Sequence, residues 1–278
     1  MSAVQSTPPV QTGFGQATVR DGGSIAYQLL RGAGPTRFAL VHSLAMDHHF
    51  WRPVTEWLLP VGDVLLHDCR GHGRSMLDGA PFTVEGFADD LADLMDGVGW
   101  SDAIVAGASM GGCVALAFAV RHAGRLRGLG LVDTTASYGA DAPQQWEERA
   151  QKALEGGMDV LVGFQKSRWF SQGFADAHPE VVRGAVDTFL ANDVAAYAET
   201  CRMLGRADLR AALSGIAAPT RILVGSEDYA TPFTMAEAMR TGIPDATLQV
   251  LEGAAHLTPL ERPKDVAATL LSLVEAVA

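Results

Sequence analysis

The chain has 278 residues, of which 48% are hydrophobic, and a formal net charge of -11 at pH 7. This length and apolar content suit either one large α/β domain or two smaller ones with a buried core. The negative charge would repel phosphate backbones, so we expect no nucleic-acid partner.

The cysteines and the lack of long apolar runs indicate where in the cell the protein works. The chain has an odd number of cysteines, and they are widely spaced: Cys69, Cys113 and Cys201. This is typical of a protein in a reducing compartment and not of a disulfide framework. Residues 1–15 are polar and contain prolines, unlike a secretory leader, and no apolar run reaches bilayer length. We therefore expect a cytoplasmic protein with no membrane partner.

Short apolar runs alternate with longer helical patterns along most of the chain. Residues 17–19 and 25–29 flank the turn Asp21-Gly22-Gly23 and predict an antiparallel hairpin. The alternation after it predicts a mostly parallel sheet of about eight strands with helices on both faces. The further strands are expected at residues 38–41, 64–66, 103–106, 129–132, 221–224 and 248–251, and the helices at 51–59, 84–98, 111–123, 233–239 and 263–277.

One interval interrupts this alternation. From residue 135 to 213 no strand pattern occurs, and helix-like segments rich in Ala, Glu, Arg and Leu fill the interval. We interpret it as a helical cap inserted after the sixth strand. The prediction is a core domain of residues 1–134 and 214–278 with a cap of residues 135–213.

Residues Gly107-Ala108-Ser109-Met110-Gly111 form a G-x-S-x-G motif between a predicted strand and a predicted helix. In this position the motif is typical of a nucleophile elbow, a tight turn that exposes a serine hydroxyl. The strained turn needs small neighbours, and Gly107 and Gly111 supply them. We therefore expect Ser109 to attack a carbonyl carbon.

A serine nucleophile needs an imidazole base and a carboxylate that orients the imidazole. Asp228 and His256 each follow a predicted strand, and the chain order Ser109, Asp228, His256 is the order that accompanies this elbow. Asp133, at the end of the sixth strand, is a rival for the acid. Asp228 could alternatively cap the following helix, although we expect Thr231 to be that cap.

Acyl transfer also needs N–H donors for the developing oxyanion. The expected donors are the backbone N–H groups of Met110, in the elbow, and of Leu44, in the loop after the third strand. His67, Cys69 and His72 could suggest a metal site, but zinc ligands are usually paired more tightly. We predict no metal there.

Several blocks of the sequence carry a family resemblance. They are His42-Ser43-Leu44, residues 68–75, Ser109-Met110-Gly111-Gly112, residues 133–136, Gly156-Gly157-Met158, Arg168-Trp169-Phe170 and residues 256–263. With these blocks the chain resembles the α/β-hydrolase superfamily and, within it, the 3-oxoadipate enol-lactonases and related esterases. His42 and Asp133 depart from that pattern, because asparagine is usual at both places.

The resemblance implies that Ser109 attacks a lactone or ester, forms an acyl-enzyme and is freed by water that His256 activates. It implies no cofactor, and its partner is a small-molecule ester or lactone. An enol-lactone of a dicarboxylic acid keeps a free carboxylate, and the acidic protein then needs a cation in its pocket. We assign this cation to Arg168, for which a solvent-facing charge is the alternative, and further substrate contacts to Trp169 and Ser43.

Other functions on the same fold stay open. A carbon-carbon hydrolase of ring-cleavage products shares the cap and triad, although those enzymes have Trp directly after the histidine, where this chain has Leu257. A slow-turnover receptor for small molecules is the alternative from another class. Ser109 excludes haloalkane dehalogenases and epoxide hydrolases, which carry aspartate at the elbow. The acyl group and a possible homo-oligomeric state stay open.

Overall fold

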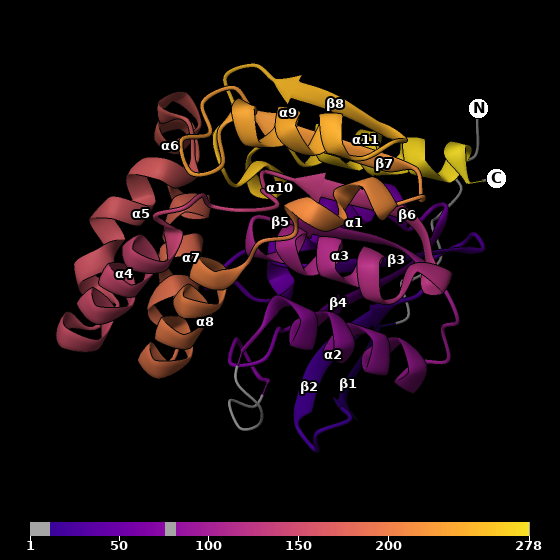
Figure 1. Cartoon of the computed structure of the whole chain (residues 1–278), viewed down its shortest axis with the longest axis horizontal. Coiled ribbons are helices and arrows are strands. Elements are labelled where there is room, and N and C mark those ends of the chain that lie inside the picture. Colours follow the sequence, from indigo (N-terminus) through magenta and orange to yellow (C-terminus); the bar gives the residue numbers. More distant parts are fainter. Residues whose placement is uncertain (1–11, 76–81, 278) are drawn as a thin grey trace, which may run out of the picture.

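The apolar runs of the sequence form the strands of one sheet. The computed structural model describes residues 12–75 and 82–277. The strands are β1 (Thr12–Thr18), β2 (Ser24–Leu30), β3 (Thr36–Val41), β4 (Gly62–His67), β5 (Ala103–Ala108), β6 (Leu126–Val132), β7 (Thr220–Gly225) and β8 (Ala246–Leu251). They lie in the order β1-β2-β4-β3-β5-β6-β7-β8 (Figure 1).

Most neighbouring strands of this sheet run in the same direction. Each pair from β4 and β3 through to β7 and β8 is parallel. β1 and β2 form the predicted antiparallel hairpin, and β2 also pairs antiparallel with β4. The predicted eight-stranded, mostly parallel sheet is therefore confirmed, and the carboxyl ends of its central strands meet at one edge.

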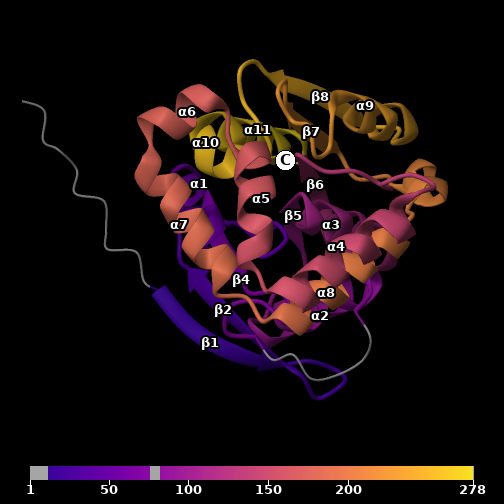
Figure 2. The same ribbon diagram turned by 90° about the vertical axis from the view of Figure 1, so that its left-hand side faces the viewer.

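Helices cover both faces of the sheet. They are α1 (Arg52–Leu58), α2 (Val84–Gly97), α3 (Met110–Arg121), α9 (Phe233–Gly242), α10 (Thr258–Glu261) and α11 (Pro263–Ala276). α1 and α11 contact each other on one face, and α2 and α3 contact each other on the opposite face (Figure 2). Among the described residues, no helix is both long enough and apolar enough to span a membrane.

The interval between β6 and β7 is helical. It contains α4 (Ala142–Gly156), α5 (Val162–Trp169), α6 (Gln172–Ala177), α7 (Pro179–Leu190) and α8 (Val194–Arg206), which lie beside the sheet in Figure 1. The Asn192 side chain donates a hydrogen bond to the Ala45 carbonyl at 2.8 Å, and the Leu257 N–H donates to the Trp169 carbonyl at 2.9 Å. These bonds join the helical interval to the loops around the sheet. The exact boundaries of core and cap stay a prediction.

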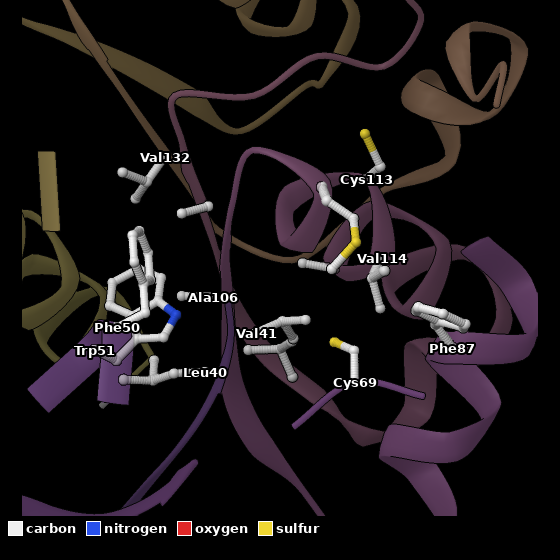
Figure 3. Packing of buried hydrophobic residues seen from close by; sticks show 14 of the residues in the cluster. Leu40, Val41, Phe50, Trp51, Cys69, Phe87, Ala106, Cys113, Val114 and Val132 are labelled. Atoms are coloured by element: carbon white, nitrogen blue, oxygen red, sulfur yellow. The ribbon is translucent and has the colours of Figure 1, made fainter. Parts of the chain in front are cut away.

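The central strands are buried on both faces, which explains why their sequences are continuous apolar runs. Leu40 and Val41 are adjacent in β3 and point to opposite faces (Figure 3). Leu40 lies on the side of Trp51, whereas Val41 lies on the side of Val114 and Phe87. Because both layers are fully buried, the strand ends that carry polar residues are held rigidly.

Candidate active site

Ser109 occupies the sharp turn between β5 and α3. Its backbone has φ of 53°, in the left-handed region that most side chains avoid. A Cβ atom on Gly107 would lie 1.9 Å from the Gly111 carbonyl oxygen, and one on Gly111 would lie 2.2 Å from the Val41 carbonyl oxygen. Only glycine fits at these two positions, so the motif is needed for the turn itself.

The structure brings Ser109, His256 and Asp228 into one hydrogen-bonded chain. His256 Nε2 lies 2.9 Å from Ser109 Oγ, and His256 Nδ1 lies 2.8 Å from Asp228 Oδ2. All three residues are buried although they come from loops after β5, β7 and β8. In this arrangement the serine hydroxyl can donate to Nε2 while the Nδ1–H group donates to the carboxylate, as nucleophilic catalysis requires.

Asp228 is held as a carboxylate by several donors. It accepts hydrogen bonds from the N–H groups of Ala230 and Thr231 and from the Thr231 hydroxyl. Burial would raise the pKa of Asp228, but the charge and hydrogen bond of His256 and the bonds from Thr231 outweigh burial and lower it. The expectation that Thr231 caps α9 is wrong: the helix begins at Phe233, so the cap residue is Pro232, and the Thr231 hydroxyl donates to Asp228.

Asp133, the rival acid, lies nearby but has other partners. Its carboxylate accepts hydrogen bonds from the Gly225 N–H and from the N–H and hydroxyl of Thr258. Burial, followed by the negative charge of Asp228, raises the pKa of Asp133 well above its ordinary value. Its contacts join the end of β6 to the turn after His256, so its geometry is that of a structural group.

The loop after β3 has the shape that an oxyanion site needs. Ala45 has φ of 58°, and the Met46 N–H donates to the Ser43 carbonyl at 3.1 Å, which closes a tight turn around Leu44. Within residues 12–75 and 82–277, the N–H groups of Leu44 and Met110 donate to no protein acceptor. Leu44 lines the same cavity as Ser109, and Met110 directly follows Ser109 in the chain, so both N–H groups are suited to stabilise a negative oxygen there.

The His42 ring holds this loop in place through contacts at both of its nitrogen atoms. Its Nδ1 lies 2.8 Å from the Ser43 carbonyl oxygen, and its Nε2 accepts a hydrogen bond from the Cys69 N–H at 2.9 Å. The rings of His67 and His72 lie next to it, with ring centroids 6.5 and 5.1 Å away. Among the described residues, the side chains of Asp47, His48 and His49 come close enough together to share a metal ion. The side chains of His67, Cys69 and His72 do not.

Because of this buried histidine cluster, we expect the free energy of unfolding to fall in acid. Burial is the main cause that lowers the pKa of His67 and of His72 from 6.5 to about 3. The unfolded chain therefore binds protons below pH 6.5 that the native chain does not. The contribution of the two neutral rings to the free energy of unfolding is fully present above pH 6.5 and is lost toward pH 3. The slope is up to about 1.4 kcal/mol per pH unit for each group.

Urea denaturation at a series of pH values measures this slope. His72→Asn should flatten it, because asparagine does not titrate and its amide can still donate to the Arg70 carbonyl that His72 Nδ1 contacts at 3.0 Å. His178→Asn, at an exposed position, is the matched control and should leave the slope unchanged. An unaltered slope in His72→Asn would show that this ring is not buried in the neutral form.

The Ser109 hydroxyl faces a cavity of about 520 Å³ between the sheet and the helical interval. Ser43, Leu44, Arg168 and Trp169 line it, together with His256. Met110 is fully buried and is not among the lining residues, so only its backbone N–H is suited to a role there. This volume lies in the range of pockets that bind small molecules.

Arg168 and Trp169 stand at one wall of this cavity. Arg168 is half-buried, its Nη2 donates to the Tyr229 carbonyl at 2.8 Å, and its guanidinium lies over the Phe164 ring at 4.8 Å. Trp169 is buried and packs edge-on against Phe189. Arg168 therefore does not simply point into solvent, although one of its donors is already used.

Arg149, which the sequence reasoning missed, is a further cation at the cavity, whose lining also includes Lys152 and Glu148. Its Nε donates to the Tyr197 hydroxyl at 2.6 Å, and its guanidinium lies 4.8 Å from the centroid of Trp146. No carboxylate of the described residues forms an ion pair with it, nor with Arg168. The sequence offered one signal for this pair: Trp146 and Arg149 are three residues apart, and residues at this spacing lie on the same face of a helix.

The comparisons with known proteins agree with this geometry. Residues 38–269 match the alpha/beta hydrolase family. The chain is 29% identical to 3-oxoadipate enol-lactonase 1 of Acinetobacter baylyi, over 89% of this chain and 91% of the relative. The crystal structure of the enol-lactonase from Burkholderia xenovorans LB400 superposes with a TM-score of 0.89 at 31% identity, covering 94% of this chain and 100% of the other.

A thermophilic esterase from Thermogutta terrifontis, in a malate-bound structure, superposes with a TM-score of 0.88 at 28% identity. This match covers 95% of this chain and 99% of the esterase. The resemblance to enol-lactonases and related esterases is therefore confirmed. On the match over residues 38–269, together with the sheet order and the strained serine turn, the chain belongs to the alpha/beta hydrolase family.

Proposed function

We propose that the protein hydrolyses small carboxylic esters or lactones through an acyl-enzyme on Ser109. The observation that carries this proposal is the hydrogen-bonded chain from Asp228 through His256 to Ser109, which ends at the cavity. The enol-lactonases and the esterase among the relatives support the same substrate class.

The geometry suits a two-step reaction. His256 Nε2 takes the proton as Ser109 Oγ attacks the carbonyl carbon, and the N–H groups of Leu44 and Met110 hold the oxyanion. His256 then returns the proton to the leaving oxygen, which gives an acyl-enzyme and a free alcohol or enol. Water activated by the same imidazole releases the acid in the second step. Asp228 stays ionised and orients His256 throughout.

A carboxylate-bearing substrate fits the charges of the cavity. Burial, and then the positive charge of Arg149, lowers the pKa of Arg168, so the two guanidinium groups repel each other. Both guanidinium groups are half-buried and have no ion-pair partner among the described residues, which is unfavourable, and a substrate carboxylate would supply that partner with paired hydrogen bonds. The malate in the related esterase structure is itself a dicarboxylate. An enol-lactone or ester of a dicarboxylic acid is therefore the proposed substrate class.

Arg149→Met is expected to raise KM for monoethyl adipate about 10- to 100-fold, because a charge-assisted hydrogen bond is lost. Diethyl adipate, which is neutral, should change by less than about threefold. The matched variant Arg168→Met should show the same selectivity with a smaller effect, since Arg168 already donates to the Tyr229 carbonyl. Equal losses on the charged and the neutral ester would remove both arginines from carboxylate binding.

Rank order of kcat/KM over lactones, enol-lactones and simple esters tests the proposed function. Steady multiple turnover supports an enzyme. Release of one equivalent of product from a chromogenic ester, followed by arrest, would instead indicate a slow-turnover receptor. Cleavage of a carbon-carbon bond with no activity on any ester would support the hydrolase of ring-cleavage products and overturn the proposal.

A further inference from the structure

Tyr138 faces the nucleophile from the loop that follows β6. Its side chain lines the same cavity as Ser109 and His256. Ser109 and Cys113 lie close enough to its hydroxyl to affect the pKa of that hydroxyl. The ring packs edge-on against Trp146, with centroids 5.0 Å apart and an angle of 76° between the rings. The phenol therefore stands at the wall of the cavity that the Ser109 hydroxyl faces.

The loop that carries Tyr138 is bound tightly to the elbow. The Thr134 hydroxyl donates to the Ser109 carbonyl at 2.6 Å, and the Cys113 thiol donates to the Thr135 carbonyl at 3.2 Å. Beyond these bonds, Ser137 forms an isolated β-bridge with the chain that follows α8. A side chain on a segment held at both ends keeps its position, so ordering it costs little conformational entropy when the substrate binds.

The sheet order decides which part of the substrate Tyr138 meets. β3 and β6 lie on opposite sides of β5, so the loops after them flank Ser109 from opposite sides. The Leu44 N–H group comes from the β3 side, and an oxyanion held there lies away from Tyr138. The remaining oxygen at the reaction centre is the leaving oxygen, which must also reach His256 Nε2 to receive a proton.

We propose that the Tyr138 hydroxyl donates a hydrogen bond to the leaving oxygen as the ester bond breaks. The bond between the carbonyl carbon and this oxygen breaks, its electron pair stays on the oxygen, and the proton that His256 took from Ser109 completes the alcohol or enol. Tyr138 transfers no proton. Its hydrogen bond stabilises the charge that builds on the oxygen before the proton arrives.

The phenol is suited to this role because it stays protonated. Burial is the main cause that raises the pKa of the Tyr138 hydroxyl well above its ordinary value, followed by Cys113 and, with a smaller effect, Asp228. Tyr138 therefore remains a donor at neutral and mildly alkaline pH. The inference rests on the proposed function, since it requires an ester or lactone with a leaving oxygen.

Tyr138→Phe tests the inference, because it removes the hydroxyl and keeps the ring against Trp146. The probes are the monoethyl and mono(4-nitrophenyl) esters of adipic acid, and the readout is kcat/KM, which reports acylation. The negative charge on a leaving ethoxide oxygen is localised and needs a hydrogen-bond donor from the protein. In nitrophenolate the charge is delocalised over the aromatic ring, so this donor matters less. The variant should lose about 10- to 100-fold on the ethyl ester and less than about threefold on the nitrophenyl ester.

The controls separate this role from a structural one. Tyr27→Phe removes a phenol hydroxyl from β2, away from the cavity residues, and should leave both esters unchanged. Labelling of Ser109 by a fluorophosphonate, whose fluoride leaves readily, should proceed at the wild-type rate in Tyr138→Phe and shows that the variant is folded. Slow labelling, an equal loss on both esters, or no loss on either would overturn the inference and leave the proposed function intact. Failure of the wild-type protein on both esters and on the whole panel of lactones and esters would overturn the proposed function and the inference with it.

Discussion

Ser109→Ala is expected to lower kcat for ester hydrolysis by about five to six orders of magnitude. The hydroxyl is the atom that forms the acyl-enzyme, and within the described cavity no second hydroxyl lies within hydrogen-bond distance of His256 Nε2. What activity remains would come from the oxyanion donors and from binding alone. Initial rates on monoethyl adipate, measured at high enzyme concentration, give the size of the loss.

Two controls accompany this measurement. Ser101→Ala, at an exposed position outside the cavity, should retain wild-type rates. The melting temperature of Ser109→Ala should stay close to that of the wild type, because the glycines around the turn are unchanged. Substantial activity in a folded Ser109→Ala protein would show that another group is the nucleophile.

Asp228→Asn is expected to lower kcat by about four orders of magnitude. An asparagine can occupy the same space, but it neither stabilises the imidazolium ion nor selects the tautomer in which His256 Nε2 accepts the Ser109 proton. The Thr231 hydroxyl and N–H, which donate to Asp228, can bond only the amide oxygen in the variant. The loss should therefore be in kcat, with KM little changed.

Asp133→Asn is the matched comparison and should behave differently. Its carboxylate accepts from Gly225 and Thr258, so the variant loses an acceptor and about 1–3 kcal/mol of stability. Its kcat should fall by less than about tenfold. Denaturant unfolding and kcat measured on both variants separate the roles, and the reverse order of the two kcat losses would make Asp133 the acid.

The sequence predicted the sheet well where strands are buried on both faces. The run at residues 103–106 became β5 (Ala103–Ala108), because a continuous apolar run has no other stable environment in this fold. The edge strand was predicted less well: residues 17–19 were expected, whereas β1 covers Thr12–Thr18. Gly13 and Gly15 weaken the local pattern, and the strand exists because it pairs with β2, where the Tyr27 ring covers Gly15.

The nucleophile turn was also readable from the sequence, since its steric demands are local. Gly107 and Gly111 are required by contacts within the turn and with the adjacent strand β3. The order of Ser109, Asp228 and His256 follows from strand ends that the apolar runs mark. These features depend on neighbours along the chain or on one strand pairing.

The choice between the two carboxylates needed the tertiary structure. Asp133 and Asp228 follow the neighbouring strands β6 and β7, and both are buried at the same edge of the sheet. Only the direction of each side chain separates them, and that direction is decided by which donors surround it: Thr258 and Gly225 for Asp133, His256 and Thr231 for Asp228.

The sequence by itself therefore determined the family, the sheet and the serine turn, because burial and backbone strain leave local patterns. The tertiary structure alone decided that Arg149 lies at the cavity without an ion-pair partner among the residues the structure describes, and that Tyr138 lines the same cavity as Ser109. Both residues belong to the segment between β6 and β7. Their surroundings arise from packing between segments far apart in the chain, and such contacts leave no periodic pattern in the residues themselves.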